Sequence, residues 1–74
     1  MLTLGIDMGS NTVKAVALRG GAQIVGRHVM KTTHDLEAVT RQCVDECLGA
    51  AGAKLEDCAR IVATGYGRVS CTIA

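Results

Sequence analysis

The sequence predicts an α/β domain in which three antiparallel strands are followed by a crossover helix and by a fourth strand parallel to the first. Near the N-terminus, apolar residues alternate with polar residues, which is the period of a β-strand. From about Asp35 the apolar residues recur at helical spacing. The later apolar run Ile61-Val62-Ala63 suits a buried strand, and a strand–helix–strand connection returns the chain parallel to its start with a right-handed crossover.

Three strands are expected before the helix. The first shows strict alternation, with Leu2, Leu4 and Ile6 interleaved with Thr3, Gly5 and Asp7. A glycine-containing turn is expected over 8–11, a second strand over 12–18 and a third over 23–30. Between the second and third strands, the pair Gly20-Gly21 favours a tight hairpin, because glycine tolerates positive φ.

The expected helix has an apolar face and a charged face. The apolar face carries Leu36, Val39, Cys43, Cys47 and Ala51. On the opposite side, Arg41 is four positions from both Glu37 and Asp45 and can pair with either. Gly49 and Gly52 are plausible helix stops. A polar connector then leads to the fourth strand, expected over 60–64.

The composition suggests part of a larger domain. The chain has 74 residues, one Tyr, no Phe and no Trp, so its core must be built from small side chains. A self-sufficient domain of this size usually needs large core residues, disulfides or a metal. We therefore expect residues 1–74 to form a partial domain whose core is completed by other residues.

Charge and hydropathy exclude several classes of partner. The net charge is +1 with both signs spread along the chain, and no basic cluster points to nucleic acid. The apolar stretches are shorter than the roughly 20 residues that cross a bilayer, so no membrane association is expected. The N-terminus lacks the pattern of a signal peptide. A cytoplasmic protein is the default expectation.

Four cysteines lie at positions 43, 47, 58 and 71. No Cys-x2-Cys pair occurs, so the spacing is a weak match to a zinc or iron–sulfur site. Cys43 and Cys47 lie four positions apart in phase with the apolar face of the helix, which favours two small buried hydrophobes. The alternative is a pair of ligands or redox thiols.

The turn after the first strand has the composition of a magnesium–phosphate site. It reads Asp7-Met8-Gly9-Ser10-Asn11-Thr12-Val13-Lys14. A glycine allows a sharp turn in which backbone N–H groups converge on an anion, hydroxyls add donors, and a lysine adds a mobile charge. A carboxylate cannot bind phosphate, but it can face Mg²⁺ through water molecules. The plain alternative is an ordinary hairpin turn, since Asp, Gly, Ser and Asn are common turn residues.

Residues 4–14 resemble the first phosphate motif of the superfamily that contains actin, sugar kinases and the large heat-shock ATPases. The order of predicted elements likewise resembles the start of a ribonuclease-H-like domain, so residues 1–74 would be a partial N-terminal subdomain of an actin-like ATPase domain. The resemblance implies ATP and Mg²⁺ as ligands, with Asp7 serving catalysis from the metal side and Lys14 adding charge. It also implies that the β- and γ-phosphates meet the turn residues Gly9, Ser10, Asn11 and Thr12. Asn11 stands where a Thr is often found, which removes one hydroxyl.

A second glycine loop narrows the resemblance. The segment Ile61-Val62-Ala63-Thr64-Gly65-Tyr66-Gly67-Arg68 is similar to the corresponding segment of activators of 2-hydroxyacyl-CoA dehydratases, such as 2-hydroxyglutaryl-CoA dehydratase, and of benzoyl-CoA-reductase-type ATPases. By physics alone, Gly65 and Gly67 bracket a tight bend. Arg68 either pairs with a phosphate or a carboxylate or stays solvated, and Tyr66 can pack over the sheet end.

What this family does follows from the resemblance alone. Its members use ATP hydrolysis to change the shape of a homodimer that holds one [4Fe-4S] cluster between its subunits. The change drives an electron to a partner dehydratase or acyl-CoA reductase. The cysteines that hold the cluster in the family lie beyond residue 74, so no iron–sulfur cluster is expected on this chain. Because half of the nucleotide site is also missing, the 74-residue chain alone is expected to be inactive.

Two alternatives remain open at this point. One is the start of another branch of the same superfamily, such as an N-acetylglucosamine-kinase-like or other sugar-kinase protein. The other is a small interaction module without enzymatic activity.

Overall fold

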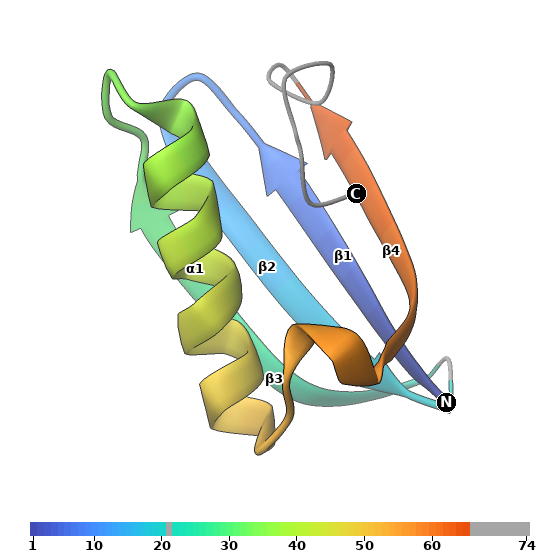
Figure 1. Cartoon of the computed structure of the whole chain (residues 1–74). Coiled ribbons are helices and arrows are strands. Elements are labelled where there is room, and N and C mark those ends of the chain that lie inside the picture. The colour runs from blue at the N-terminus through green and yellow to red at the C-terminus, as the bar shows by residue number, and fades with distance from the viewer. Residues whose placement is uncertain (21, 66–74) are drawn as a thin grey trace.

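The computed structural model describes residues 1–20 and 22–65. Its elements in chain order are β1 (Leu2–Met8), β2 (Thr12–Arg19), β3 (Gln23–Lys31), α1 (Leu36–Ala51), the short 3₁₀ turn η1 (Leu55–Asp57) and β4 (Cys58–Gly65). The four strands form one sheet in the order β3-β2-β1-β4 (Figure 1). β1 and β2 pair antiparallel, as do β2 and β3, whereas β4 lies parallel to β1.

The predicted fold class is confirmed, and the predicted elements are all present within a few residues of their expected ends. The largest difference lies at the start of β4, which begins at Cys58 rather than at residue 60. The connector is shorter than expected because η1 closes it: the Lys54 N–H donates to a carboxylate oxygen of Asp57 at 2.9 Å. The chain therefore enters the sheet directly after this turn.

The core lies between α1 and one face of the sheet (Figure 1). Strand alternation sends every second side chain of β1 and β2 into it, as the period of two predicts. Its members are Leu2, Leu4, Ile6, Met8, Val13, Ala15, Ala17, Val39, Cys43, Val44, Cys47 and Leu48. These side chains are mostly small, so α1 must approach the sheet closely. Buried Gly26 on β3 allows this, since a Cβ there would overlap the Cys47 carbonyl oxygen of the helix.

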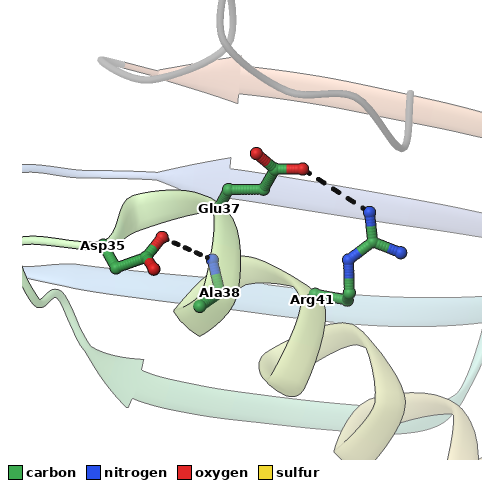
Figure 2. A network of polar contacts seen from close by, with 4 residues as sticks. All are labelled: Asp35, Glu37, Ala38 and Arg41. Carbon is green, nitrogen blue, oxygen red and sulfur yellow. Dashed lines mark hydrogen bonds and ion pairs between the residues drawn. The ribbon is translucent and has the colours of Figure 1, made fainter.

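Both ends of α1 are capped by its own sequence. The Asp35 carboxylate accepts a hydrogen bond from the Ala38 N–H at 3.1 Å, which satisfies one of the free amides of the first turn (Figure 2). Gly52 ends the helix in the left-handed region, with φ of 67°, whereas Gly49, the other expected stop, lies inside the helix. The predicted Glu37–Arg41 pair is present at 3.6 Å, on the solvent side. The alternative pairing of Arg41 with Asp45 is not among the ion pairs of the described residues.

One face of the sheet and both of its edges remain uncovered in the part of the chain that the structure describes. No described helix packs on the face opposite α1, and β4 has a single neighbour, β1 (Figure 1). Val29 and Val62 are exposed large hydrophobic residues, at 45% and 40% of their full areas. Neither described helix is long and apolar enough to cross a membrane.

Candidate functional site

The bend between β1 and β2 is held by backbone bonds and by one threonine. The Gly9 N–H donates to the Thr12 carbonyl at 2.9 Å. Thr32, just after β3, donates twice: its hydroxyl to the Gly9 carbonyl at 3.0 Å and its N–H to the Asn11 carbonyl at 2.8 Å. Within the described part of the chain, the N–H groups of Ser10 and Asn11 donate to no other group. The bend therefore has fixed carbonyls and two free amides.

The φ of Gly9 is not positive, so an unusual backbone conformation is not what favours glycine at this position. The constraint is space, since a Cβ at Gly9 would lie 3.0 Å from the Thr12 carbonyl oxygen. Because the Gly9 N–H is already bonded to that oxygen, the backbone donors open to an anion are those of Ser10 and Asn11.

Asp7 and Lys14 lie opposite each other on neighbouring strands. They are cross-strand partners in the β1–β2 register, and both are exposed on the face that α1 does not cover. No ion pair joins them among the described residues. An open hollow of about 330 Å³ lies beside them, lined by Gly5, Ile6, Asp7, Lys14, Val16, Val62 and Thr64. A carboxylate and an ammonium group that do not neutralise each other can bind two different partners, a cation and an anion.

The end of β4 lies against the end of β1, as the parallel topology predicts. Asp7 is paired with Thr64, and Met8 with Gly65. The Thr64 hydroxyl donates to the Ile6 carbonyl at 3.5 Å. Thr64 and Gly65 of the second glycine loop therefore lie beside the first loop. The other predicted residues of this loop, Tyr66, Gly67 and Arg68, lie outside the described residues.

The cysteines match the interpretation as buried hydrophobes. Cys43 and Cys47 are fully buried in the core, and Cys58 is half-buried. Burial raises the pKa of the Cys43 thiol to about 11, with a further contribution from neighbouring Cys47. Burial likewise raises the pKa of Cys47. Among residues 1–20 and 22–65, no three His, Cys, Asp or Glu side chains come close enough together to hold a metal ion, while Cys71 lies outside these ranges.

One contributor to the site escaped the sequence reasoning. Thr32 lies 23 positions from Gly9 and stands in a connector without any motif. Its role follows from the antiparallel β2–β3 pairing, which brings the residue after β3 alongside the bend. Only the exact register, which alternation does not determine in a connector, could have identified it.

No family model matches the chain, but curated proteins and solved structures do. The activator of lactoyl-CoA dehydratase from Anaerotignum propionicum is 43% identical over 68 residues, which cover 92% of this chain and 26% of that protein. The chain spans about a quarter of the length of the curated relatives it matches.

Two solved structures share the fold closely. Component A of the (R)-2-hydroxyglutaryl-CoA dehydratase of Acidaminococcus fermentans superposes with a TM-score of 0.88 at 37% identity, over 95% of this chain and 27% of that chain. The activator of the 2-hydroxyisocaproyl-CoA dehydratase from Clostridium difficile, solved with bound ADPNP, gives a TM-score of 0.88 at 30% identity, over 97% of this chain and 26% of that one. In sequence and fold, the chain is therefore similar to the N-terminal part of dehydratase activators, at the start of an actin-like ATPase fold, as the two glycine loops predicted.

Proposed function

We propose that this chain is the segment of a 2-hydroxyacyl-CoA dehydratase activator ATPase that holds the phosphate groups of ATP. The observation that carries the proposal is the juxtaposition at the end of β1. There, two free amides, an exposed lysine and an exposed carboxylate surround one bend. The relatives support the choice of activator over sugar kinase, since those with matching sequence and fold are named as dehydratase activators.

In this proposal, the phosphates contact the bend. The amides of Ser10 and Asn11 donate to phosphate oxygens, as in other anion-binding backbone concavities. The hydroxyls of Ser10 and Thr12 add uncharged donors. Lys14 supplies the positive charge that phosphate oxygens require, on a flexible stem that can follow them. Thr32 keeps the bend in shape, because it bonds two of its carbonyls.

Asp7 fits the metal side of the site. Its carboxylate is exposed and has no hydrogen bond or ion pair with a described residue, so its oxygens are free to accept from metal-bound water. When bound, Mg²⁺ would stabilise the charge that develops on the transferred phosphoryl group. Asp7 would orient this hydrated ion from the end of β1.

The larger activity belongs to the same proposal. The full protein would work as a homodimer around a [4Fe-4S] cluster and pass an electron to a dehydratase or acyl-CoA reductase. The described cysteines are poor candidates for the cluster, since Cys43 and Cys47 point into a packed core and retain their protons. We therefore expect the cluster ligands elsewhere in the protein.

The test uses a protein that carries this segment together with the remaining length of its relatives. Asp7→Asn should reduce ATP hydrolysis at least about tenfold more than it weakens binding, because metal positioning matters most for transition-state charge. Lys14→Ala should weaken binding by about 1.5–3 kcal/mol, the range for a hydrogen bond to a charged group, or roughly 10- to 150-fold in Kd. Calorimetric titration and single-turnover hydrolysis separate the two effects.

Matched controls are available in the chain. Asp45→Asn removes an exposed carboxylate from α1, and Arg19→Ala removes an exposed cation from the far end of β2. Both should leave binding and hydrolysis within about twofold, since their charges lie far from the bend and are screened by salt. Equal losses of binding and turnover in the Asp7 and Lys14 variants would contradict the division of roles.

A further inference from the structure

Gly65, the last residue of β4, lies against the Asp7 side chain. Its φ is +93°, a conformation that L side chains rarely adopt. A Cβ at this position would lie 2.7 Å from the Asp7 carboxylate oxygen Oδ1 and 2.7 Å from the Met8 carbonyl oxygen. Both distances are shorter than real Cβ contacts, so a side chain here would force the carboxylate or the backbone to move.

This contact matters because little else holds the carboxylate. Asp7 makes no hydrogen bond or ion pair with the described residues. Packing therefore limits its position, and the backbone at the end of β4 lies on one side of it. The end of β4 is held against β1, because Met8 and Gly65 are register partners and the Thr64 hydroxyl donates to the Ile6 carbonyl.

We infer that Gly65 is a positioning residue that restricts the rotamer of the Asp7 carboxylate from the β4 side. The small size of glycine leaves room for the carboxylate in one place, and the adjoining backbone prevents it from swinging across the sheet end. The use of that carboxylate for a hydrated metal ion rests on the proposed function, whereas the positioning itself does not.

Other glycines of the chain provide the control. Gly52 and Gly20 also have positive φ, +67° and +64°, but a Cβ at either would meet nothing within 4 Å. Gly52→Ala therefore strains the backbone without touching the site. Gly65→Ala also strains the backbone and, in addition, displaces Asp7. A difference between the two variants at Asp7 reports the contact rather than the strain.

The experiment measures the χ1 angle of Asp7 by three-bond NMR couplings in the 74-residue chain, at a dilution at which light scattering gives a monomer. The wild-type chain should show one dominant rotamer. Gly65→Ala should shift the couplings toward averaged values, and Gly52→Ala should retain them. Averaged couplings in the wild-type chain would overturn the inference even if Gly65→Ala failed to fold, and so would unchanged couplings in a folded Gly65→Ala variant.

A second arm separates this inference from the proposed function. Mn²⁺, used alone as the probe, should broaden the Asp7 carboxyl carbon signal in the wild-type chain and in Gly52→Ala, and should broaden it less in Gly65→Ala. If Mn²⁺ leaves the wild-type signal unchanged while the couplings still respond to Gly65→Ala, the metal role of Asp7 fails and the positioning role stands. If Mn²⁺ broadens the signal equally in all three chains and the couplings do not differ, the positioning role fails alone.

Discussion

Cys43 is a buried residue whose thiol makes the stability of the fold depend on pH. Its thiol lies between α1 and the sheet and donates toward the carbonyl oxygens of Val13, at 3.5 Å, and His28, at 3.4 Å. Desolvation raises the pKa of this thiol to about 11. The folded chain therefore favours the neutral thiol over the thiolate.

This shift predicts a loss of stability at alkaline pH. In the unfolded chain the thiol ionises near its ordinary pKa of about 8.5, whereas in the folded chain it keeps its proton until about pH 11. The stabilisation that the protonated thiol gives to the fold is therefore fully present below the pKa of the unfolded chain. It is lost as the pH rises through the pKa of the folded chain. In this pH range the free energy of unfolding falls by at most about 1.4 kcal/mol per pH unit because of this thiol. Urea unfolding between pH 8 and 10.5 would measure it.

Cys43→Ala provides the comparison for this prediction. The variant should be less stable at pH 8, since it leaves a small cavity in the core, but its stability should fall less steeply between pH 9 and 10.5. Cys47 remains in the variant and contributes its own raised pKa, so the slope should decrease without vanishing. Parallel pH profiles for the two chains would contradict the assignment.

At the scale of elements, two glycines have opposite predicted effects. Gly26 on β3 is where α1 touches the sheet, and a Cβ there would overlap the Cys47 carbonyl oxygen and approach the Ala51 Cβ at 3.0 Å. Gly26→Ala should therefore destabilise the fold by about 1–3 kcal/mol, because the helix must move away. Gly49 lies inside α1 with nothing within 4 Å of an added Cβ. Gly49→Ala should stabilise by about 0.5–1 kcal/mol, the usual gain in a helix interior.

Chemical denaturation of both variants checks this pair. The two substitutions add the same methyl group, so the difference in sign isolates the helix–sheet contact from general effects of alanine. A neutral effect of Gly26→Ala would contradict the close contact of α1 with Gly26. A shift of the denaturation midpoint in the same direction in both variants would contradict it as well.

The element scale also shows what sequence reasoning could reach. The period of two predicted β1, the period of 3.6 predicted α1 and an apolar run predicted β4, since these patterns are local properties of the sequence. The meeting of Asp7 with the end of β4 follows from the parallel topology alone. Contacts such as Thr32 with Gly9, or Gly65 with the Asp7 oxygen, depend on exact register and on distances of a few ångströms. Such quantities are set by packing of the whole sheet and have no local signal.

At the scale of the whole molecule, the candidate site is an open hollow at the surface of the described residues. Asp7 and Lys14 line this hollow and are exposed to water. In water, a charge–charge contact at about 4 Å contributes only about 1 kcal/mol, while binding costs an estimated 4–15 kcal/mol of lost freedom. We therefore expect the 74-residue chain to bind Mg²⁺–ATP more weakly than about 1 mM and to hydrolyse it no faster than background.

The outer position of β4 in the described sheet predicts concentration-dependent self-association. Among the described strands β4 has a single neighbour, β1, and Val62 on it is exposed. Calorimetric titration with Mg²⁺–ATP, combined with light scattering over a range of protein concentrations, tests both expectations. A monodisperse monomer with micromolar affinity, and turnover abolished by Asp7→Asn, would contradict both expectations.

The parallel pairing of β4 with β1 also sets the order in which the molecule assembles. β1, β2 and β3 are joined by short hairpins, so their contacts close small loops. β4 must instead pair with a strand far away in the sequence, since the hydrogen bond between Thr64 and Ile6 spans 58 positions. Closing so long a loop costs more chain entropy before any contact forms. β4 should therefore join the meander late and detach from it early. Asp7 and Gly65 lie on opposite strands of this late-forming β1–β4 pair. The contact between Gly65 and the Asp7 carboxylate should therefore form last, after the bend between β1 and β2.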